Sequence, residues 1–464
     1  MTPHDFRDEW KERLRGQANP LLATRRPDGL HVLSGAALWN RAIEMVKTWR
    51  RAGAKPGDLL IDSPAGIAGA TRIVAALVGG FLYYPMPPEE FTMGWQAPAK
   101  RSGERRAFRL NFGQVQGLAE VAMPDSVASL EPLQPNARFV LGTSGTSGKG
   151  RLIVVLDAEC IRHQLICHAE ALDLREGAAR LTILPWWHSF GLVLDLLLGL
   201  WARQSIWIQP DLSFRNHSLV EVCRDDHINH LAVVPRLAEV LFAGLRNTPG
   251  LPALCLHTGG ARVTDSLRRA AVTRVGRWVD GYGLTECGPG VLLDGVPIGC
   301  DVSIEKGTGE LLVRSDFVGL FHGRRERFDG SGRLRTRDIV EADAAGRLSV
   351  LGRLDNAWKD ASGNWVTARD IEEWAEQKCA AEVIGIAGDG ARGLRLAIAL
   401  PEGTGKSALN WSGSLQNVFH RRFGVPVTVR TCVLTPEYRR LLESVRAKTT
   451  SDALVKSMFP SANE

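Results

Sequence analysis

The chain has 464 residues, of which 44% are hydrophobic and 23% are charged. This composition is ordinary for soluble globular proteins, and the length exceeds what one hydrophobic core usually organises, so two or three domains are expected. The formal net charge of +6 comes without a run of five or more Lys and Arg residues, so we expect no nucleic-acid partner and no membrane-surface binding.

The cysteines and the apolar runs indicate the compartment. The eight cysteines are scattered, without a C-x-x-C pair or the histidine spacing of a zinc site, which favours free thiols in a reducing environment. The charged N-terminal stretch lacks the apolar core of a signal peptide. The most apolar run, residues 190–202, is too short to span a bilayer and contains Asp195, so we predict a buried helix there. A cytoplasmic protein without a membrane span is expected.

The first third of the chain alternates helical and strand patterns. Apolar residues at helical spacing predict a helix over 38–51, and strand, helix and strand are predicted over 58–63, 67–81 and 82–85. This order is typical of a parallel α/β layer. Residues 88–135 show little pattern, and only connecting structure is expected there.

A loop rich in glycine, serine and threonine follows. Residues 140–152 have the sequence VLGTSGTSGKGRL. Glycines let backbone N–H groups approach an anion, hydroxyls donate to phosphate oxygens, and Lys149 and Arg151 supply positive charge. It is not a Walker loop, because glycine follows its Gly-Lys pair, and no serine in it lies in the G-x-S-x-G pattern of a nucleophile elbow. Taken alone, a flexible surface loop is the alternative.

Beyond this loop the α/β alternation continues. A strand is predicted over 151–156 and a helix over 157–172, with Asp157 as its N-cap. The strand over 181–184 ends in PWWHSFG at 185–191. Polar and aromatic residues at the carboxyl end of a strand occur where open α/β sheets bind ligands. His188 alone is equally compatible with a structural role.

Further strands are predicted over 205–208, 230–234, 254–257 and 277–280, and helices over 217–227, 236–246 and 264–275. The third strand runs into Thr258-Gly259-Gly260-Ala261. The last runs into GYGLTE at 281–286, which is not a dinucleotide fingerprint because Glu286 takes the place of its final glycine. Tyr282 could stack on a base, Thr285 could donate to phosphate and Glu286 could hold Mg²⁺. An isolated hexapeptide of this kind is more often a turn.

From residue 309 the pattern changes to short strands, predicted over 310–314 and 347–351, with polar turns. Asp338 follows Arg335-Thr336-Arg337, and GRLD follows at 352–355. Taken alone, these charges suit a surface strand. A helix is predicted over 366–376. We place a domain boundary near Asp355, so that residues 1–354 form a large domain and residues 355–464 form a small α+β domain.

Taken together and in order, these motifs resemble those of the adenylate-forming superfamily, which comprises acyl-CoA synthetases, aryl-acid ligases, firefly-type luciferases and nonribosomal adenylation domains. The hexapeptide GYGLTE matches the family pattern without a mismatch, and the resemblance covers most of the chain. It implies an α/β fold, with a large N-terminal domain of stacked α/β sheets, a small β subdomain and a small mobile α+β C-terminal domain. It also implies that ATP activates a carboxylic acid to acyl-AMP, and that a thiol of coenzyme A or of the phosphopantetheine of an acyl carrier protein then displaces AMP.

The resemblance also assigns roles to residues of its motifs. Those implied to bind ATP or AMP are Thr143, Ser144, Gly145, Thr146, Ser147, Gly148, Lys149, Arg151, Gly259, Gly260, Ala261, Asp280, Gly281, Tyr282, Asp338 and Arg353. The implied acyl pocket contains Trp187, His188, Gly259 and Gly283. The implied catalytic residues are His188, Thr285, Glu286 and Lys448, with Mg²⁺ on Glu286, and the implied hinge is Asp355.

The chain departs from the family pattern at three of these motifs. The phosphate loop ordinarily continues with Pro-Lys-Gly, but Gly150-Arg151-Leu152 stand here, and the usual Thr-Gly-Asp is 336–338, Thr-Arg-Asp. The catalytic lysine normally lies in a Gly-Lys pair. Lys448 is the best-placed candidate for it, with Lys456 and Lys406 as alternatives.

The sequence of the acyl motif indicates which class of carboxylic acid is the substrate. Amino-acid adenylation domains carry an aspartate just after an aromatic residue there, whereas residues 186–190 are WWHSF. A free α-amino acid is therefore disfavoured, and an aryl or fatty acid is expected. The alternative function is a catalytically degenerate member that binds nucleotide or acyl ligands as an interaction or regulatory protein. The altered phosphate loop and the weak motif around Lys448 favour that alternative, and the intact Glu286, Asp338 and Arg353 oppose it.

Overall fold

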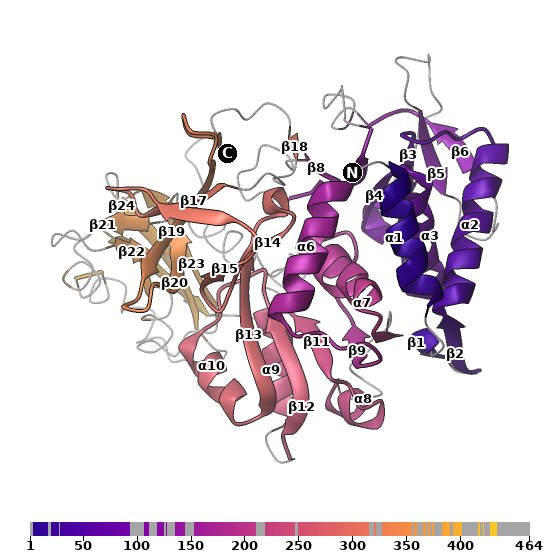
Figure 1. Ribbon diagram of the computed structural model, residues 1–464. Coiled ribbons are helices and arrows are strands. Elements are labelled where there is room, and N and C mark those ends of the chain that lie inside the picture. Colours follow the sequence, from indigo (N-terminus) through magenta and orange to yellow (C-terminus); the bar gives the residue numbers. More distant parts are fainter. Residues whose placement is uncertain are drawn as a thin grey trace. The chain divides into compact units, whose positions relative to one another are not determined.

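A computed structural model covers residues 1–464 (Figure 1). It describes residues 3–16, 20–26, 28–92, 106–110, 118–124, 127, 135–143, 153–209, 219–245, 249–314, 320–321, 327–354, 357–359, 365–367, 370–371, 374, 383–389, 393–400, 416–417, 421 and 427–433. The chain divides into two compact units. The first comprises Met1–Val302 and Val313–Leu334, and the second comprises Ser303–Leu312 and Arg335–Glu464.

The first unit begins with a helix and a β-hairpin. They are α1 (Pro3–Arg15), β1 (Pro20–Arg26) and β2 (Gly29–Ser34). The predicted helix at 38–51 is α2 (Gly35–Arg51), which starts three residues earlier because the Ser34 hydroxyl caps it by accepting the N–H of Ala37 at 3.2 Å. The next predicted elements are confirmed as β3 (Leu59–Asp62), α3 (Gly66–Gly79) and β4 (Leu82–Pro85).

One sheet of the first unit has seven strands in the order β18-β8-β7-β4-β3-β5-β6. Its further members are β5 (Ala107–Leu110), β6 (Leu118–Val121), β7 (Ala137–Gly142), β8 (Ile153–Asp157) and β18 (Leu320–Phe321). The expectation of connecting structure alone over 88–135 is wrong, because α4 (Pro88–Phe91), β5 and β6 lie there. Arg109 in β5 and Glu120 in β6 interrupt the apolar runs by which the equally short β3 and β4 were recognised.

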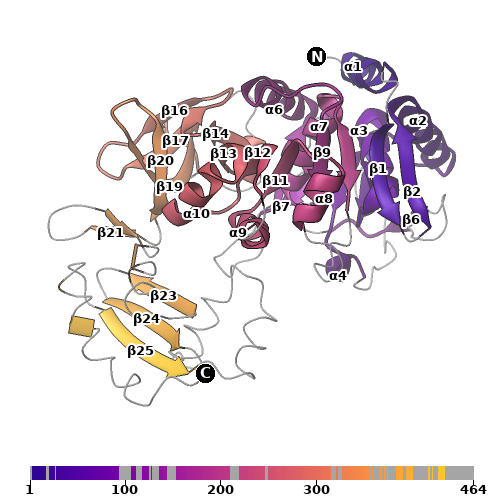
Figure 2. The ribbon, with the colours of Figure 1, turned by 90° about the horizontal axis from the view of Figure 1, so that it is seen from below.

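The other sheet has nine strands in the order β15-β14-β13-β12-β11-β9-β10-β1-β2 (Figure 2). Its further members are β9 (Ala179–Thr182), β10 (Ser205–Ile208), β11 (His230–Val233), β12 (Leu251–Thr258), β13 (Val275–Gly283), β14 (Gly290–Leu293) and β15 (Val296–Pro297). The connecting helices are α6 (Ala158–Ala171), α8 (Leu219–Asp225), α9 (Pro235–Gly244) and α10 (Asp265–Val272). Asp157 caps α6 as predicted, accepting the N–H of Cys160 at 2.7 Å.

The predicted buried helix at 190–202 consists of a π-helix (Phe190–Leu197) followed by α7 (Leu198–Trp201). Its charged residue, Asp195, is fully buried. It accepts from the Arg180 guanidinium, with 3.3 Å between Oδ1 and the nearest guanidinium nitrogen, and Gln204 accepts from Nε of the same arginine at 2.7 Å. Burial raises the pKa of Asp195. The partners explain how a carboxyl group is accommodated in this apolar segment.

The two sheets share one hydrophobic core. It joins residues of the seven-stranded sheet, such as Tyr83 and Phe139, with residues of the nine-stranded sheet, such as Ile206 and Val279, through buried positions of α2, α3, α6 and the π-helix. This arrangement confirms the predicted stacked α/β sheets.

The second unit is mainly antiparallel. Its sheets contain β16 (Asp301–Ile304), β17 (Glu310–Arg314), β19 (Leu334–Ala342) and β20 (Leu348–Arg353); β21 (Ala357–Lys359) and β22 (Trp365–Thr367); and β23 (Val383–Asp389), β24 (Gly393–Leu400) and β25 (Val427–Val433). The predicted small antiparallel subdomain is thus present. The predicted helix start at Val366 is wrong, because this residue pairs with Trp358 in a strand, as suits a β-branched side chain. Asp355 lies outside the described residues, so the boundary there stays a prediction.

Candidate active site

The acyl motif is a tight reversal between β9 and the π-helix. The His188 N–H donates to the Pro185 carbonyl at 3.3 Å, and the His188 carbonyl accepts the Leu192 N–H at 2.9 Å. A Cβ on Gly191 would lie 2.4 Å from the Pro185 oxygen, so only glycine fits the turn. The His188 side chain is exposed, and its ring centroid lies 6.3 Å from that of Trp187. The motif therefore presents both predicted residues at the carboxyl end of the sheet.

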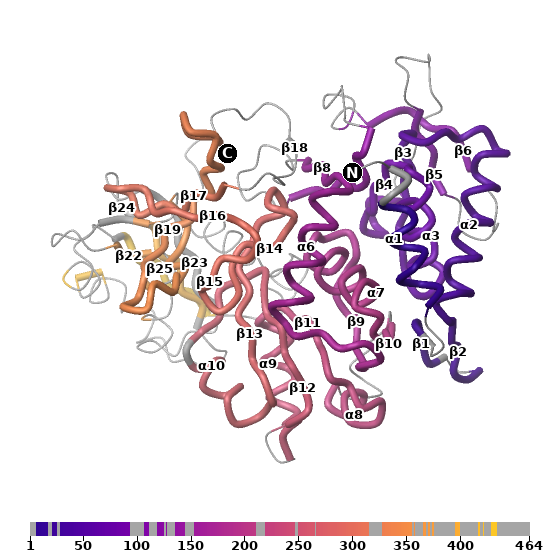
Figure 3. Tube along the Cα trace, viewed as in Figure 1, coloured from indigo at the N-terminus to yellow at the C-terminus, as the bar shows by residue number. Residues whose placement is uncertain are grey.

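The hexapeptide at 281–286 is not a turn. Residues 281–283 complete β13, which pairs with the antiparallel β14 (Figure 3), and Thr285–Cys287 forms a short 3₁₀ helix. Its glycines allow close backbone packing, because a Cβ on Gly281 would meet the His257 Nε2 at 2.6 Å and a Cβ on Gly283 would meet the Pro289 oxygen at 1.9 Å. The Tyr282 side chain is half-buried.

The structure brings these two motifs into direct contact. The hydroxyl oxygens of Ser189 and Thr285 lie 3.1 Å apart and share a hydrogen bond, although 96 positions separate them in the sequence. Ser189 is buried, and Thr285 is half-buried. The acyl motif and the Thr-Glu pair therefore form one site.

Glu286 lies beside Thr285 in this site. Its side chain is only 7% exposed, and its Oε1 lies 3.5 Å from a guanidinium nitrogen of Arg327, which is also buried. Arg327 belongs to the same compact unit. The carboxylate thus has a cationic partner in the position where the resemblance implies Mg²⁺.

The segment of residues 258–261, at the end of β12, lies against the acyl motif. The Thr258 hydroxyl donates to the Val279 carbonyl at 3.1 Å, and the Gly259 N–H donates to Val233. A Cβ on Gly259 would lie 3.3 Å from the Phe190 ring, which packs edge-on against His257 with 5.1 Å between centroids. Burial lowers the pKa of His257 to about 3, so this ring is neutral.

The remaining predicted residues near this segment have different surroundings. Gly260, with a φ of 79°, and Ala261 are exposed. Asp280 forms an ion pair with Arg268, and its N–H donates to Asp294 at 2.8 Å. Burial raises the pKa of Asp280. Its carboxylate is therefore held by the protein itself.

The second unit holds Asp338 and Arg353 together. They are cross-strand neighbours in β19 and β20, and the guanidinium of Arg353 donates to the Asp338 Oδ1 at 3.2 Å and to the Thr336 carbonyl at 3.2 Å. The Asp338 N–H donates to the Thr336 hydroxyl at 3.0 Å. Asp338 is 5% exposed, so this carboxylate is held in a fixed position by its neighbours.

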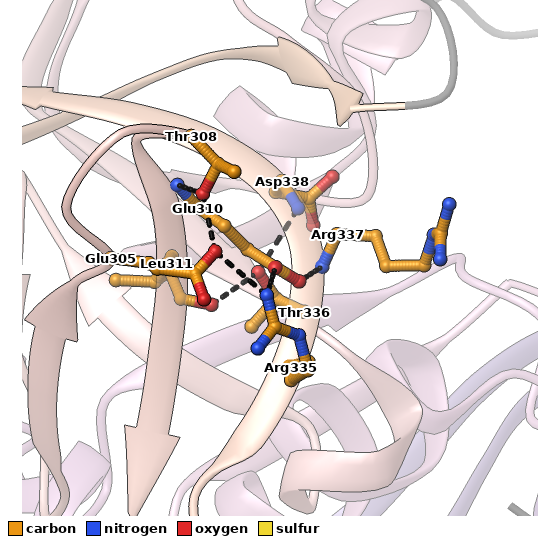
Figure 4. Close-up of polar contacts among 8 residues, drawn as sticks. All are labelled: Glu305, Thr308, Glu310, Leu311, Arg335, Thr336, Arg337 and Asp338. Carbon is orange, nitrogen blue, oxygen red and sulfur yellow. Dashed lines mark hydrogen bonds and ion pairs between the residues drawn. The ribbon is translucent and has the colours of Figure 1, made fainter. Parts of the chain in front are cut away.

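Arg337, which replaces the family's glycine, has a φ of 63°. This left-handed conformation is the one for which glycine is normally chosen. Its N–H donates to the buried Glu310 carboxylate at 2.8 Å, and Arg335 donates to the same carboxylate at 2.7 Å (Figure 4). The Arg337 side chain extends away from Glu310. Glu310 therefore stabilises a backbone conformation that arginine disfavours.

Of the predicted ATP-binding residues of the phosphate loop, only Thr143 belongs to the described residues. Thr143 follows β7 and is half-buried. The following lie outside the described residues: Ser144, Gly145, Thr146, Ser147, Gly148, Lys149, Arg151, Asp355 and Lys448. Within the part of the chain that is described, no three His, Cys, Asp or Glu residues group as a metal site, and no helix is long and apolar enough to cross a membrane.

Sequence reasoning missed three residues of the site. Ser189 lies inside the acyl motif, where its hydroxyl was the available signal. Arg327 and Gln164 belong to no motif, and only tertiary contacts bring them to residues 286–290.

Comparison with known proteins finds one matching family model. Residues 96–314 match the model described as AMP-binding enzyme, and this region contains both the acyl motif and the Thr285-Glu286 pair. No protein of curated function matches the sequence significantly.

Solved structures have a similar fold over most of the chain. O-succinylbenzoate coenzyme A synthetase from Bacillus subtilis, in complex with AMP, has a TM-score of 0.73 at 15% identity, covering 98% of each chain. ATP-bound MatB from Rhodopseudomonas palustris has a TM-score of 0.68 at 17% identity, covering 91% of this chain and 94% of its own. The anthranilate CoA ligase AuaEII, with anthranoyl-AMP, has a TM-score of 0.68 at 16% identity, covering 96% and 98%.

Proposed function

We propose that the chain uses ATP to activate an aryl or fatty carboxylic acid, but not a free α-amino acid, as acyl-AMP. The acyl group then passes to a thiol of coenzyme A or of carrier-protein phosphopantetheine in a reducing, cytoplasmic compartment. The hydrogen bond between Ser189 and Thr285 carries this proposal, because it joins an acyl motif to a nucleotide motif inside the region matched by the family model. The ligands named for the similar structures, AMP, ATP and anthranoyl-AMP, agree with it.

The residues of the first unit suit the first step. When bound, Mg²⁺ would neutralise phosphate charge, and it needs only one or two protein carboxylates besides phosphate oxygens. The buried Glu286 fits that requirement. The Thr285 hydroxyl can donate to a phosphate oxygen, and the phosphate loop with Lys149 and Arg151 would hold the triphosphate. His188 and Trp187 would border the acid, next to Gly259 and Gly283.

The second unit would supply the remaining nucleotide contacts. Asp338 can accept from both ribose hydroxyls, and Arg353 orients its carboxylate. We assign the catalytic lysine to Lys448 and the hinge to Asp355, which divides a large domain of 1–354 from a small mobile domain of 355–464. Phosphoryl chemistry of this kind depends mainly on positioning and charge neutralisation, which these residue types provide.

One observation favours a second candidate function. Because the Arg327 guanidinium already faces Glu286 at 3.5 Å, a chain that never binds a metal there would still have its buried carboxylate paired. Such a chain would bind nucleotide or acyl ligand without turnover, as an interaction or regulatory protein. The intact Asp338–Arg353 pair does not separate the two, since either function needs a nucleotide.

A panel of carboxylic acids tests the proposal. The full chain, with Mg²⁺ and ATP, should exchange labelled pyrophosphate into ATP when an aryl or fatty acid is present, and not with free α-amino acids. Acids that support exchange should then be offered with coenzyme A and with a phosphopantetheinylated carrier protein. Absence of exchange with every acid, together with measurable ATP binding, would instead establish the binding protein.

A further inference from the structure

Gln164 on α6 binds the backbone that follows Thr285-Glu286. Its side-chain Nε2 donates to the Cys287 carbonyl and to the Gly290 carbonyl, both at 3.1 Å. Its Oε1 accepts the Gly290 N–H at 2.8 Å. Gln164 is 4% exposed, and all three hydrogen bonds are buried.

These bonds hold both ends of a four-residue segment. The 3₁₀ helix that contains Glu286 ends at Gly288, whose φ is 95° and whose N–H donates to the Thr285 carbonyl at 3.2 Å. The Leu284 N–H donates to the Pro289 carbonyl at 2.8 Å. A Cβ on Gly288 would lie only 3.0 Å from the Gln164 Cγ, so this segment packs directly on the side chain.

Glutamine suits this position chemically. The segment offers two carbonyls and one N–H, and a primary amide supplies two donors and an acceptor from one side chain. Leucine would leave three buried backbone groups without partners, and glutamate would face two carbonyls with an acceptor-only group. The helix that carries Gln164 is itself anchored, because Ile161 and Leu165 are fully buried in the core.

We propose that Gln164 is a positioning residue for the activation step, fixing residues 287–290 and thereby the Thr285 hydroxyl and the Glu286 carboxylate. It acts through backbone groups alone, while Ser189 holds the Thr285 hydroxyl directly. The proposed role of Glu286 on Mg²⁺ rests on the proposed function above. The three hydrogen bonds of Gln164 do not depend on that function.

The test compares Q164L and Q164E with a matched control, Q204L. Gln204 is another fully buried glutamine, but its oxygen accepts from Arg180 rather than from this segment. Three measurements are made on each full-length variant: unfolding in urea, amide hydrogen exchange in peptides spanning residues 284–293, and the Mn²⁺ affinity of the chain saturated with a non-hydrolysable ATP analogue. Where the wild type exchanges pyrophosphate, the Mg²⁺ concentration for half-maximal rate is added.

Loss of the three bonds should accelerate amide exchange of the segment and weaken Mn²⁺ binding by about tenfold in Q164L, the factor that corresponds to the loss of one buried hydrogen bond at the Glu286 end of the segment. Q164E, which places an acceptor-only group against two carbonyls, should accelerate amide exchange at least as much as Q164L. Q204L should lose stability while leaving both readouts unchanged. The proposal is overturned if Q164L keeps wild-type Mn²⁺ affinity, or if Q204L shifts it equally. A wild type that binds Mn²⁺ and nucleotide but activates no acid would refute the proposed function alone.

Discussion

Replacing Arg337 by glycine should stabilise the protein. Arg337 has a φ of 63°, in a region that costs an L-residue about 1–2 kcal/mol relative to a right-handed conformation. Glycine has no such cost. Its unfolded backbone is more flexible, however, which reduces the gain in the free energy of unfolding by about 0.5–1 kcal/mol. The bond from the residue 337 N–H to Glu310 needs no side chain, so R337G keeps it. The net gain should be about 0.5–1 kcal/mol.

Urea unfolding of the full chain, monitored by circular dichroism, measures this gain. The transition that reports on the second unit should move to higher urea, and its thermal midpoint should rise by about 2–4 °C. R337A is the necessary control, because it removes the same side chain but keeps a Cβ at positive φ. If R337A gained as much stability as R337G, or if R337G lost stability, backbone strain at residue 337 would not be the cause.

Three further predictions concern the first unit. E286Q should reduce pyrophosphate exchange by about 100-fold, with unfolding in urea little changed; near-wild-type exchange would remove Glu286 from the site. R327Q should raise the Mn²⁺ affinity of the nucleotide complex several-fold, because it removes a buried cation 3.5 Å from Glu286; weaker affinity would mean that Arg327 contacts nucleotide. Burial lowers the pKa of His168 to about 4. The unfolded imidazole takes up a proton below about pH 6.5, whereas the folded one stays neutral until about pH 4, so stability should fall with pH across this window, by about 2 kcal/mol at pH 5 for this group. H168N should show a shallower loss between pH 7 and pH 5 in urea unfolding, and an unchanged slope would assign the loss to other groups.

The elements that the sequence predicted well are those with a local physical signal. Asp157 precedes an apolar-periodic run and caps α6, and the segment Leu82–Pro85 is a strand with the predicted bounds. β5 and β6, which have the same length, were missed because Arg109 and Glu120 interrupt their apolar runs. Val366 failed for another reason, since its pairing with Trp358 decided between strand and helix, and such pairing is not visible in the local sequence.

The same division holds for the candidate site. Motif residues such as Glu286 and Asp338 were predicted from their residue types and from the order of the motifs in the sequence. The sequence does not reveal which other side chains form hydrogen bonds to these motifs and position them. Gln164 reaches Gly290 across 126 positions and Ser189 reaches Thr285 across 96, and no pattern within α6 or the acyl motif distinguishes these residues from their neighbours.

Arg337 departs from the family pattern without disturbing the neighbouring Asp338. Arginine in place of glycine at 337 could have displaced the adjoining aspartate, but Glu310 accepts both the Arg337 N–H and the Arg335 guanidinium, and Arg353 still reaches Asp338 at 3.2 Å. The Asp338 carboxylate is therefore kept in place by local compensation. Because either candidate function needs a nucleotide, this compensation does not choose between them. The choice depends on the residues that must hold pyrophosphate and the reacting oxygen, which the pyrophosphate-exchange assay probes directly.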